Sequence, residues 1–251
     1  MPSAQFPLTS DSSATDATSY TTASITPTAN RYIEVDVLNT KAASPPTTPT
    51  LSGNGLTYVE VASVTFDTIA SPLKRRTRFR SMGAAPTAGA ITIDFGGVTQ
   101  TGCIWSVKEF DSVDTTGTFG SGAHVQSATN SANTGTSLTV TLAAFGSTDN
   151  ATTGGFGIND DVAINPGTGF TEIHDNVIAT VPVCGQETEW RNDNDTSVDA
   201  SASDAANKRW GGIASELKFA AAAAGHPAVR RHGLVRHGRP VEVGRGGVSV
   251  A

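Results

Sequence analysis

Arginine and histidine, the side chains that hold anions and metal ions, gather at the C-terminal end of this chain. Residues 225–251 contain five arginines and three histidines, and the tripeptide Arg-His-Gly occurs twice, at 231–233 and at 236–238. A guanidinium group can hold a carboxylate or a phosphate through two parallel hydrogen bonds. The segment is therefore a candidate for binding nucleic acid, a metal ion or an acidic protein surface.

Charge separates these candidates. The net charge of the chain is −6, and residues 220–251 carry +4 from five arginines and Glu242, so the preceding residues carry −10. A body of that charge repels the phosphate backbone, which makes nucleic acid an unfavourable partner. Identical copies would instead present carboxylates to one another's arginines. The arginines are Arg230, Arg231, Arg236, Arg239 and Arg245.

The tail also has a strand-like ending. Val241 and Val243 alternate with other residues as in a β-strand, and the Gly and Pro residues between the arginines disfavour a helix. We expect an attachment arm that adds a strand to a neighbouring subunit and pairs its arginines with acidic residues there. Two alternatives stay open: a disordered basic tail that touches nucleic acid, and a last strand packed on the chain's own body.

Metal ligands are sparse. The tail histidines lie six and five residues apart without a cysteine or carboxylate cluster, which argues against zinc. The acidic loops 157–167 and 191–204 offer oxygens that calcium prefers but lack EF-hand spacing, and Asp and Asn also favour turns. No cofactor is expected, and calcium stays an alternative through Asp193, Asp195, Asp199 and Asp204.

Catalytic patterns do not stand out. The sequence has no phosphate-binding glycine loop, no HExxH zinc motif and no GxSxG nucleophile elbow. His174, beside Asp175 and near Glu172, comes nearest to an acid–base group, but a strand histidine flanked by acids is more often a surface residue. The sequence therefore predicts a protein that is not an enzyme.

Two further sets of side chains could bind a partner. Arg76, Arg78 and Arg80 share one face of a predicted strand, which favours a solvated outer face that protects a sheet edge. The alternative is a basic stripe for an anionic ligand or a neighbouring subunit. Trp190 and Trp210 are candidate glycan contacts in a chain rich in hydroxyl groups, which makes a carbohydrate-binding module a second hypothesis. Trp105 and Tyr58 are weaker candidates, and the apolar neighbours of Trp105 favour a place in the core.

The elements that must position these side chains are short strands rich in β-branched and aromatic residues. In residues 31–39 Glu34 and Asp36 alternate with valine and isoleucine, which predicts a half-buried strand. The pattern predicts an all-β protein, an antiparallel β-sandwich of jelly-roll or lectin-like type with extended N- and C-terminal arms. The other predicted strands are 56–66, 74–83, 90–97, 102–113, 137–145, 154–164, 170–184, 188–192 and 208–219.

Three regions are predicted. Residues 1–30 are rich in Ser, Thr and Ala and form an arm without a core, either a disordered leader or an arm that orders on a partner. Residues 31–219 form the β-sandwich body, and residues 220–251 combine an alanine linker with the basic arm.

Compartment signals are few. The N-terminus lacks a secretory signal, and no stretch approaches the roughly 18 apolar residues of a membrane span, so no membrane partner is expected. Cys103 and Cys184, the only cysteines, fit either a disulfide or two buried free thiols.

The chain resembles virion structural proteins of tailed bacteriophages. The resemblance covers most of residues 31–251 and supplies no functional residue. It implies a subunit carried in several copies on the outside of a particle that is assembled in the host cytoplasm. The expected role is capsid decoration or cement, with other virion proteins and copies of the chain as partners; the alternative is a head spike or a tail or baseplate appendage that contacts host-surface polysaccharide. The segments that carry it are RYIEVDVLN, GNGLTYVEV, RRTRFRSMGAAPTAGAITIDFGG, GCIWSVKEFDSVD and HPAVRRHGLVRHGRPVEVGRGGVSV.

Overall fold

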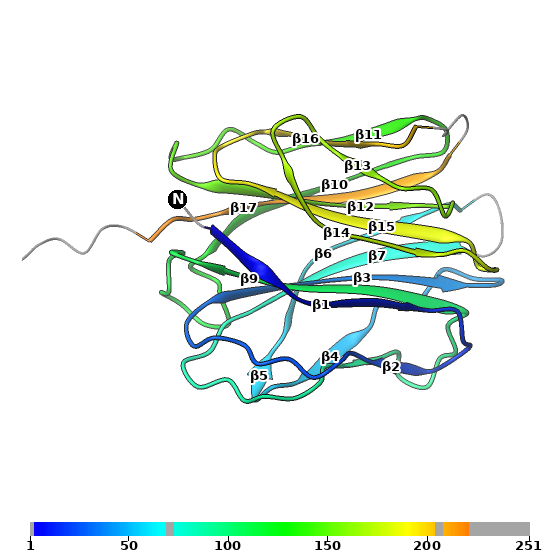
Figure 1. Ribbon diagram of the computed structural model, residues 1–251, viewed down its shortest axis with the longest axis horizontal. Helices are drawn as coiled ribbons and strands as arrows, with labels where there is room; N and C mark the ends of the chain where they lie inside the picture. Colours follow the sequence, from blue (N-terminus) through cyan, green and yellow to red (C-terminus); the bar gives the residue numbers. More distant parts are fainter. Residues whose placement is uncertain (1–2, 69–72, 204–207, 221–251) are drawn as a thin grey trace, which may run out of the picture. The chain divides into compact units, whose positions relative to one another are not determined.

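The computed structural model describes residues 3–68, 73–203 and 208–220. Within these ranges all regular structure is β-strand, arranged in four antiparallel sheets (Figure 1). The predicted all-β class, with antiparallel sheets packed face to face as in a β-sandwich, is confirmed. The jelly-roll or lectin-like subtype stays a prediction.

Nine strands make up the first half of the chain. They form a five-stranded sheet in the order β1-β9-β3-β7-β6 and a four-stranded sheet in the order β2-β8-β4-β5. Their bounds are β1 Ser3–Ser13, β2 Ser19–Thr21, β3 Tyr32–Lys41, β4 Thr50–Gly53, β5 Leu56–Thr57, β6 Val59–Phe66, β7 Leu73–Ser81, β8 Thr92–Asp94 and β9 Gly102–Asp111.

Eight strands make up the second half. They form a five-stranded sheet in the order β10-β17-β12-β15-β14 and a three-stranded sheet in the order β11-β16-β13. Their bounds are β10 His124–Ala132, β11 Ser137–Thr141, β12 Ala151–Ile158, β13 Asn165–Pro166, β14 Thr171–Ile178, β15 Cys184–Arg191, β16 Ser197–Ser201 and β17 Trp210–Leu217.

The two halves repeat one arrangement in the same chain order. In the five-stranded sheets β10, β17, β12, β15 and β14 occupy the places of β1, β9, β3, β7 and β6. In the smaller sheets β11, β16 and β13 occupy the places of β2, β8 and β4, whereas β5 has no counterpart among the described strands. The described chain is therefore a structural duplication of one two-sheet unit.

The four sheets lie in layers (Figure 1). The two five-stranded sheets, called here the central sheets, face each other, and each carries its smaller sheet on its outer side. The edge strand β1 lies beside β14, and β6 lies beside β10. The two central sheets therefore cover each other's edges, which protects strands that would otherwise offer unpaired backbone groups.

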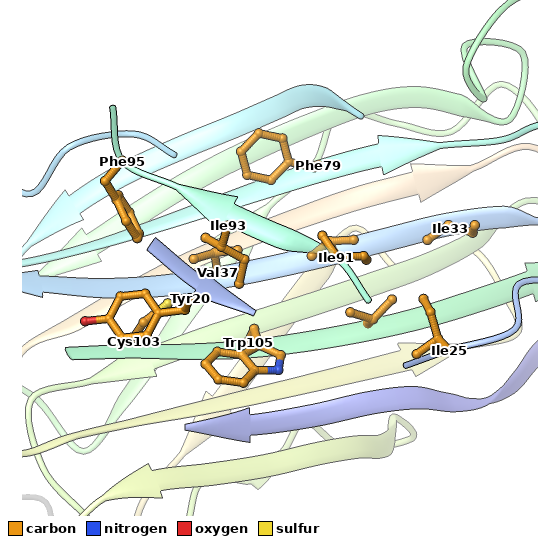
Figure 2. Packing of buried hydrophobic residues seen from close by; sticks show 12 residues of the cluster. Tyr20, Ile25, Ile33, Val37, Phe79, Ile91, Ile93, Phe95, Cys103 and Trp105 are labelled. Carbon is orange, nitrogen blue, oxygen red and sulfur yellow. The ribbon is translucent and has the colours of Figure 1, made fainter. Parts of the chain in front are cut away.

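An apolar core fills the space between each central sheet and its outer sheet. In the first half Ile33 and Val37 of β3 point toward the four-stranded sheet, where they meet Ile93 of β8 (Figure 2). Val35 of β3 and Trp105 of the neighbouring strand β9 belong to the same cluster. In the second half the equivalent core is built around Phe156 and Trp210. Burial of these side chains supplies most of the drive to fold.

The space between the central sheets is different, because charged side chains occupy its middle. Apolar clusters that include Tyr32 and Leu38 close its two ends. Glu34 and Asp36 of β3 lie between them and are fully buried. Strand β3 is therefore buried on both faces, and the prediction of a half-buried strand was wrong because a second sheet covers its polar face.

The N-terminal region differs from the arm that its composition predicts. Residues 3–13 form β1, which pairs with β9, and Tyr20 and Ile25 belong to the core of the first half. Strand β1 lies at the edge of its sheet and is held by its backbone hydrogen bonds to β9, so it can form from a polar sequence with few large apolar residues. The body also comprises two two-sheet units where a single sandwich over 31–219 was expected.

Candidate functional site

The predicted basic stripe on β7 lies at the centre of the molecule. Asp36 of β3 stands directly opposite Arg78 in the antiparallel register, and β9 brings Lys108 to the other side. The Asp36 carboxylate accepts from Arg78 Nε at 2.9 Å and from Lys108 Nζ at 2.5 Å, and Arg76 Nη2 lies 3.1 Å away. Glu34 pairs with Arg78 at 3.3 Å and with Lys108 at 2.9 Å. These five side chains are called here the ion cluster.

The ion cluster also joins the two halves. Arg76 Nη1 donates to the carbonyl of Phe156 at 2.8 Å. Arg78 Nη1 donates to Thr153 Oγ1 at 2.9 Å and to Ser215 Oγ at 3.1 Å. The facing sheet thus supplies small and hydroxyl side chains, so all five charges come from the first half and the second half provides neutral hydrogen-bond partners.

Electrostatics keep this cluster ionised. Burial alone would raise the pKa of Asp36, but Arg78, Lys108 and Arg76 outweigh it and hold that pKa well below its usual range. Burial likewise opposes the charge of Arg78, yet Asp36 and Glu34 raise its pKa. The stripe prediction was therefore wrong for Arg76 and Arg78: β7 is an inner strand, and its charged face meets another sheet in place of solvent. The cluster is a structural element that no ligand can reach.

The third arginine of the stripe has a different role. Arg80 is half-buried, and its Nη1 donates to the carbonyls of Thr118 at 3.3 Å and Phe119 at 2.8 Å. It therefore fixes the loop between β9 and β10.

His174 forms a pair that resembles a nucleophile and its base. Its Nδ1 lies 2.7 Å from Ser106 Oγ, which also contacts Thr188 Oγ1 at 3.2 Å. Burial, helped by Lys108, lowers the pKa of His174 to about 4, so the ring is neutral near pH 7. Ser106 is fully buried between the central sheets, where no substrate can meet it. The pair is a structural hydrogen bond.

Neither predicted glycan contact presents a free ring. Trp210 is fully buried in the second-half core and donates its indole N–H to the Gly135 carbonyl at 3.1 Å, so that prediction was wrong. Trp190 is half-buried and packs edge-on against Phe110, with ring centroids 6.5 Å apart. Trp105 lies in the first-half core, as its neighbours indicated.

The acidic loop 191–204 is occupied by its own arginine. Arg191 forms ion pairs with Asp193 and with Asp195, the latter at 2.6 Å. Asp199 lies on β16, and Asp204 falls outside the described residues. Among the residues described, no group of three or more His, Cys, Asp or Glu side chains is arranged to hold a metal ion.

Cys103 and Cys184 are both buried and unbridged. Burial raises the pKa of Cys103 well above its usual value and that of Cys184 to about 12. Neither thiol is therefore reactive at neutral pH. Of the two alternatives that the sequence left open, the structure has the free thiols.

Glu187 and Glu189 of β15 are two further carboxylates. They lie on the face of this strand opposite to that of Thr188. Neither oxygen of the fully buried Glu187 has a hydrogen-bond partner among the described residues, and Glu189 accepts from the Gly167 N–H at 2.8 Å. Burial and the neighbouring Glu189 raise the pKa of Glu187 well above its usual value. Burial raises the pKa of Glu189 to about 8, although the Gly167 hydrogen bond opposes it.

These two groups predict a pH dependence of stability. Above the ordinary glutamate pKa of 4.5, the folded chain retains protons on Glu187 and Glu189 that the unfolded chain has lost, so the free energy of unfolding should fall as pH rises. The contribution of Glu189 levels off above about pH 8. We expect Glu187→Gln to stabilise by about 2 kcal/mol near pH 8 and hardly at all near pH 4. Urea unfolding at both pH values checks this, with the exposed Glu60→Gln as control. Equal effects of Glu187→Gln at both pH values would contradict it.

The surface is hollowed beside the loop that Arg80 fixes. A pocket of about 220 Å³ lies between this loop and the segment that follows β7, and the residues that line it include Asn30, Met82, Ala84, Thr115 and Phe119.

No helix in the described ranges is long and apolar enough to cross a membrane.

The predicted attachment arm lies outside the described residues. This applies to Arg230, Arg231, Arg236, Arg239, Arg245, Val241 and Val243. Comparison with family models, with curated proteins and with solved structures finds no match to this chain.

Proposed function

We propose that this chain is a non-enzymatic structural subunit of a bacteriophage-like particle, which decorates or stabilises the capsid and attaches through its basic C-terminal arm. One observation carries the proposal: the described residues form four sheets and four apolar clusters among themselves. The charge of the basic tail is opposite to that of this acidic body, so we assign the tail to contact with a partner.

The order of the strands supports the proposal by analogy. In each half most consecutive strands cross between a central and an outer sheet, as they do in a jelly roll, whereas β4 and β5, β6 and β7, and β14 and β15 stay in one sheet. Jelly rolls recur in viral capsid proteins and in lectins. Because one fold serves many functions, the analogy is compatible with capsid decoration and with a carbohydrate-binding appendage.

The open sheet edges indicate where an arm could pair. The edges of the central sheets cover each other, so among the described strands β2, β5, β11 and β13 of the outer sheets are the edge strands that pair on one side only. A strand that contains Val241 and Val243 would satisfy backbone groups at such an edge of a neighbouring copy. Its arginines would then pair with acidic residues on the body of that neighbouring copy, and this charge pairing would fix the orientation of the arm.

Deletion of residues 225–251 is expected to leave the body folded and to abolish assembly. The unfolding midpoint should change by no more than about 2 °C, because the four apolar clusters of the described residues stay intact. Light scattering and co-sedimentation with particles measure assembly. A full-length variant with the five tail arginines replaced by glutamine loses the positive charge of the tail but keeps the residues that could form a strand. It therefore shows whether assembly depends on the ion pairs or on strand pairing. Normal assembly of the truncated chain would overturn the proposal.

A host-contacting appendage that binds polysaccharide is the second candidate. The pocket beside Phe119 favours it, because it brings an exposed aromatic ring and polar side chains together on the body surface.

A further inference from the structure

The loop between β9 and β10 holds an aromatic ring at the surface. The Phe119 side chain is 42% exposed, and among the Phe, Tyr and Trp side chains whose burial the structure describes, those of residues 7–68, 73–203 and 208–220, no other is exposed to this degree. Its backbone φ is 52°, a left-handed conformation that is unusual for a bulky residue. Such conformations cost about 1–3 kcal/mol and persist where the surrounding structure enforces them, often at ligand sites.

The surroundings of Phe119 provide that enforcement. Arg80 donates to the Phe119 carbonyl at 2.8 Å, and the Thr118 N–H donates to Ser121 Oγ at 3.0 Å. Gly120, at φ 79°, packs so closely on the ring of Tyr32 that an added Cβ would lie 2.9 Å from it. The loop is therefore anchored to the body on both sides of Phe119, and the ring is presented in a fixed place.

The pocket that Phe119 lines has a distinctive chemistry. Met82 and Ala84 give it an apolar wall, while Asn30 and Thr115 add an amide and a hydroxyl. None of its lining residues in the described part of the chain is charged. At about 220 Å³ it is smaller than the roughly 300–1,000 Å³ of pockets that enclose drug-sized ligands.

A sugar in the pyranose form has the chemical properties that match this pocket. A pyranose ring is neutral, carries C–H groups on its faces that pack on an aromatic ring, and carries hydroxyl groups around its edge. We propose that this pocket binds a single neutral pyranose unit, with Phe119 against its C–H face and with Asn30 and Thr115 hydrogen-bonded to its hydroxyls. The proposal goes beyond the structural role of the first candidate function and specifies the ligand of the second, the host-contacting appendage; it is argued from residues of the body alone.

The proposal is tested by NMR titration of the full chain with the methyl pyranosides of glucose, galactose, N-acetylglucosamine and rhamnose. For at least one of them we expect saturable shifts of the backbone amides around 30, 82–84 and 115–120, with a millimolar dissociation constant typical of one small ligand. Phe119→Ala should weaken this binding by about tenfold or more.

The control is Val181→Ala, which removes another exposed apolar side chain far along the sequence and should leave the affinity unchanged. Thermal unfolding of both variants checks that each is folded, and Phe119→Tyr, which keeps the ring, should retain binding. The absence of saturable shifts with all four sugars would overturn the proposal. Shifts confined to other parts of the body, or unchanged affinity in folded Phe119→Ala, would also overturn it.

Discussion

Replacement of Asp36 by asparagine is expected to lower the free energy of unfolding by about 3–5 kcal/mol, because it leaves buried cations without their main partner. Asp36 is the carboxylate that Arg76, Arg78 and Lys108 share. Asparagine keeps the shape of the side chain but removes its charge, so Glu34 alone would balance three buried cations. Urea unfolding measures the loss.

The matched control for this prediction is Lys218→Gln. It breaks the ion pair between Lys218 and Asp114, in which the lysine side chain is 53% exposed, and should cost no more than about 1 kcal/mol. Salt provides a second test, because added salt screens exposed pairs far more than buried ones. If Asp36→Asn cost no more than Lys218→Gln, or if its cost vanished in high salt, the ion cluster would have to be open to water.

The sequence patterns located the buried strands better than the edges. Strand β3 was predicted because valine and isoleucine alternate with polar residues along it, and β7 because arginine alternates with Thr, Phe and Ser. Strand β9 was predicted from its β-branched and aromatic residues between Gly and Asp. The equivalent edge strands β1 and β10 were both missed, and for the same reason. An edge strand is covered on one side only, so SAQFPLTSDSS and HVQSATNSA pair well with few large apolar residues.

The ion cluster could have been found from the sequence. Alternation on one strand shows which residues share a face, but it does not show whether water or a second sheet lies beyond. A signal exists only across strands: Glu34 and Asp36, Arg76 and Arg78, and Lys108 occupy matching faces of three predicted strands with opposite signs. Complementary charges on neighbouring strands indicate mutual pairing, and mutual pairing permits burial.

The pocket had no comparable signal. Residues 115–122, TTGTFGSG, have the composition of a flexible loop, and the contact that shapes them comes from Arg80, far away in the sequence. The duplication was equally hidden, because the facing surfaces of the central sheets carry different side chains. The first half supplies charged groups, and the second supplies Thr153, Gly155 and Ser215.

This asymmetry makes Gly155 of β12 the most sensitive small residue of the second half. A Cβ atom added there would lie 1.9 Å from Arg76 Nη2 and 2.8 Å from Arg78 Nη2. A flexible arginine could ordinarily move aside, but Arg76 is fully buried and bonded to the Phe156 carbonyl, so movement breaks its pairing. We expect Gly155→Ala to destabilise the chain by about 3 kcal/mol through steric overlap and loss of this pairing.

Gly146→Ala is the control, because a Cβ atom at that position meets no atom within 4 Å, and its effect should be within about 0.5 kcal/mol. A double-mutant cycle identifies the cause. If the methyl group acts by displacing the Arg76 guanidinium, Gly155→Ala should cost at least about 1 kcal/mol less in an Arg76→Met background than in the native chain. Strict additivity of the two substitutions would mean that the methyl group acts on the backbone of β12 and not on the ion cluster. The packing of the two central sheets would then not depend on the space that this glycine leaves for Arg76.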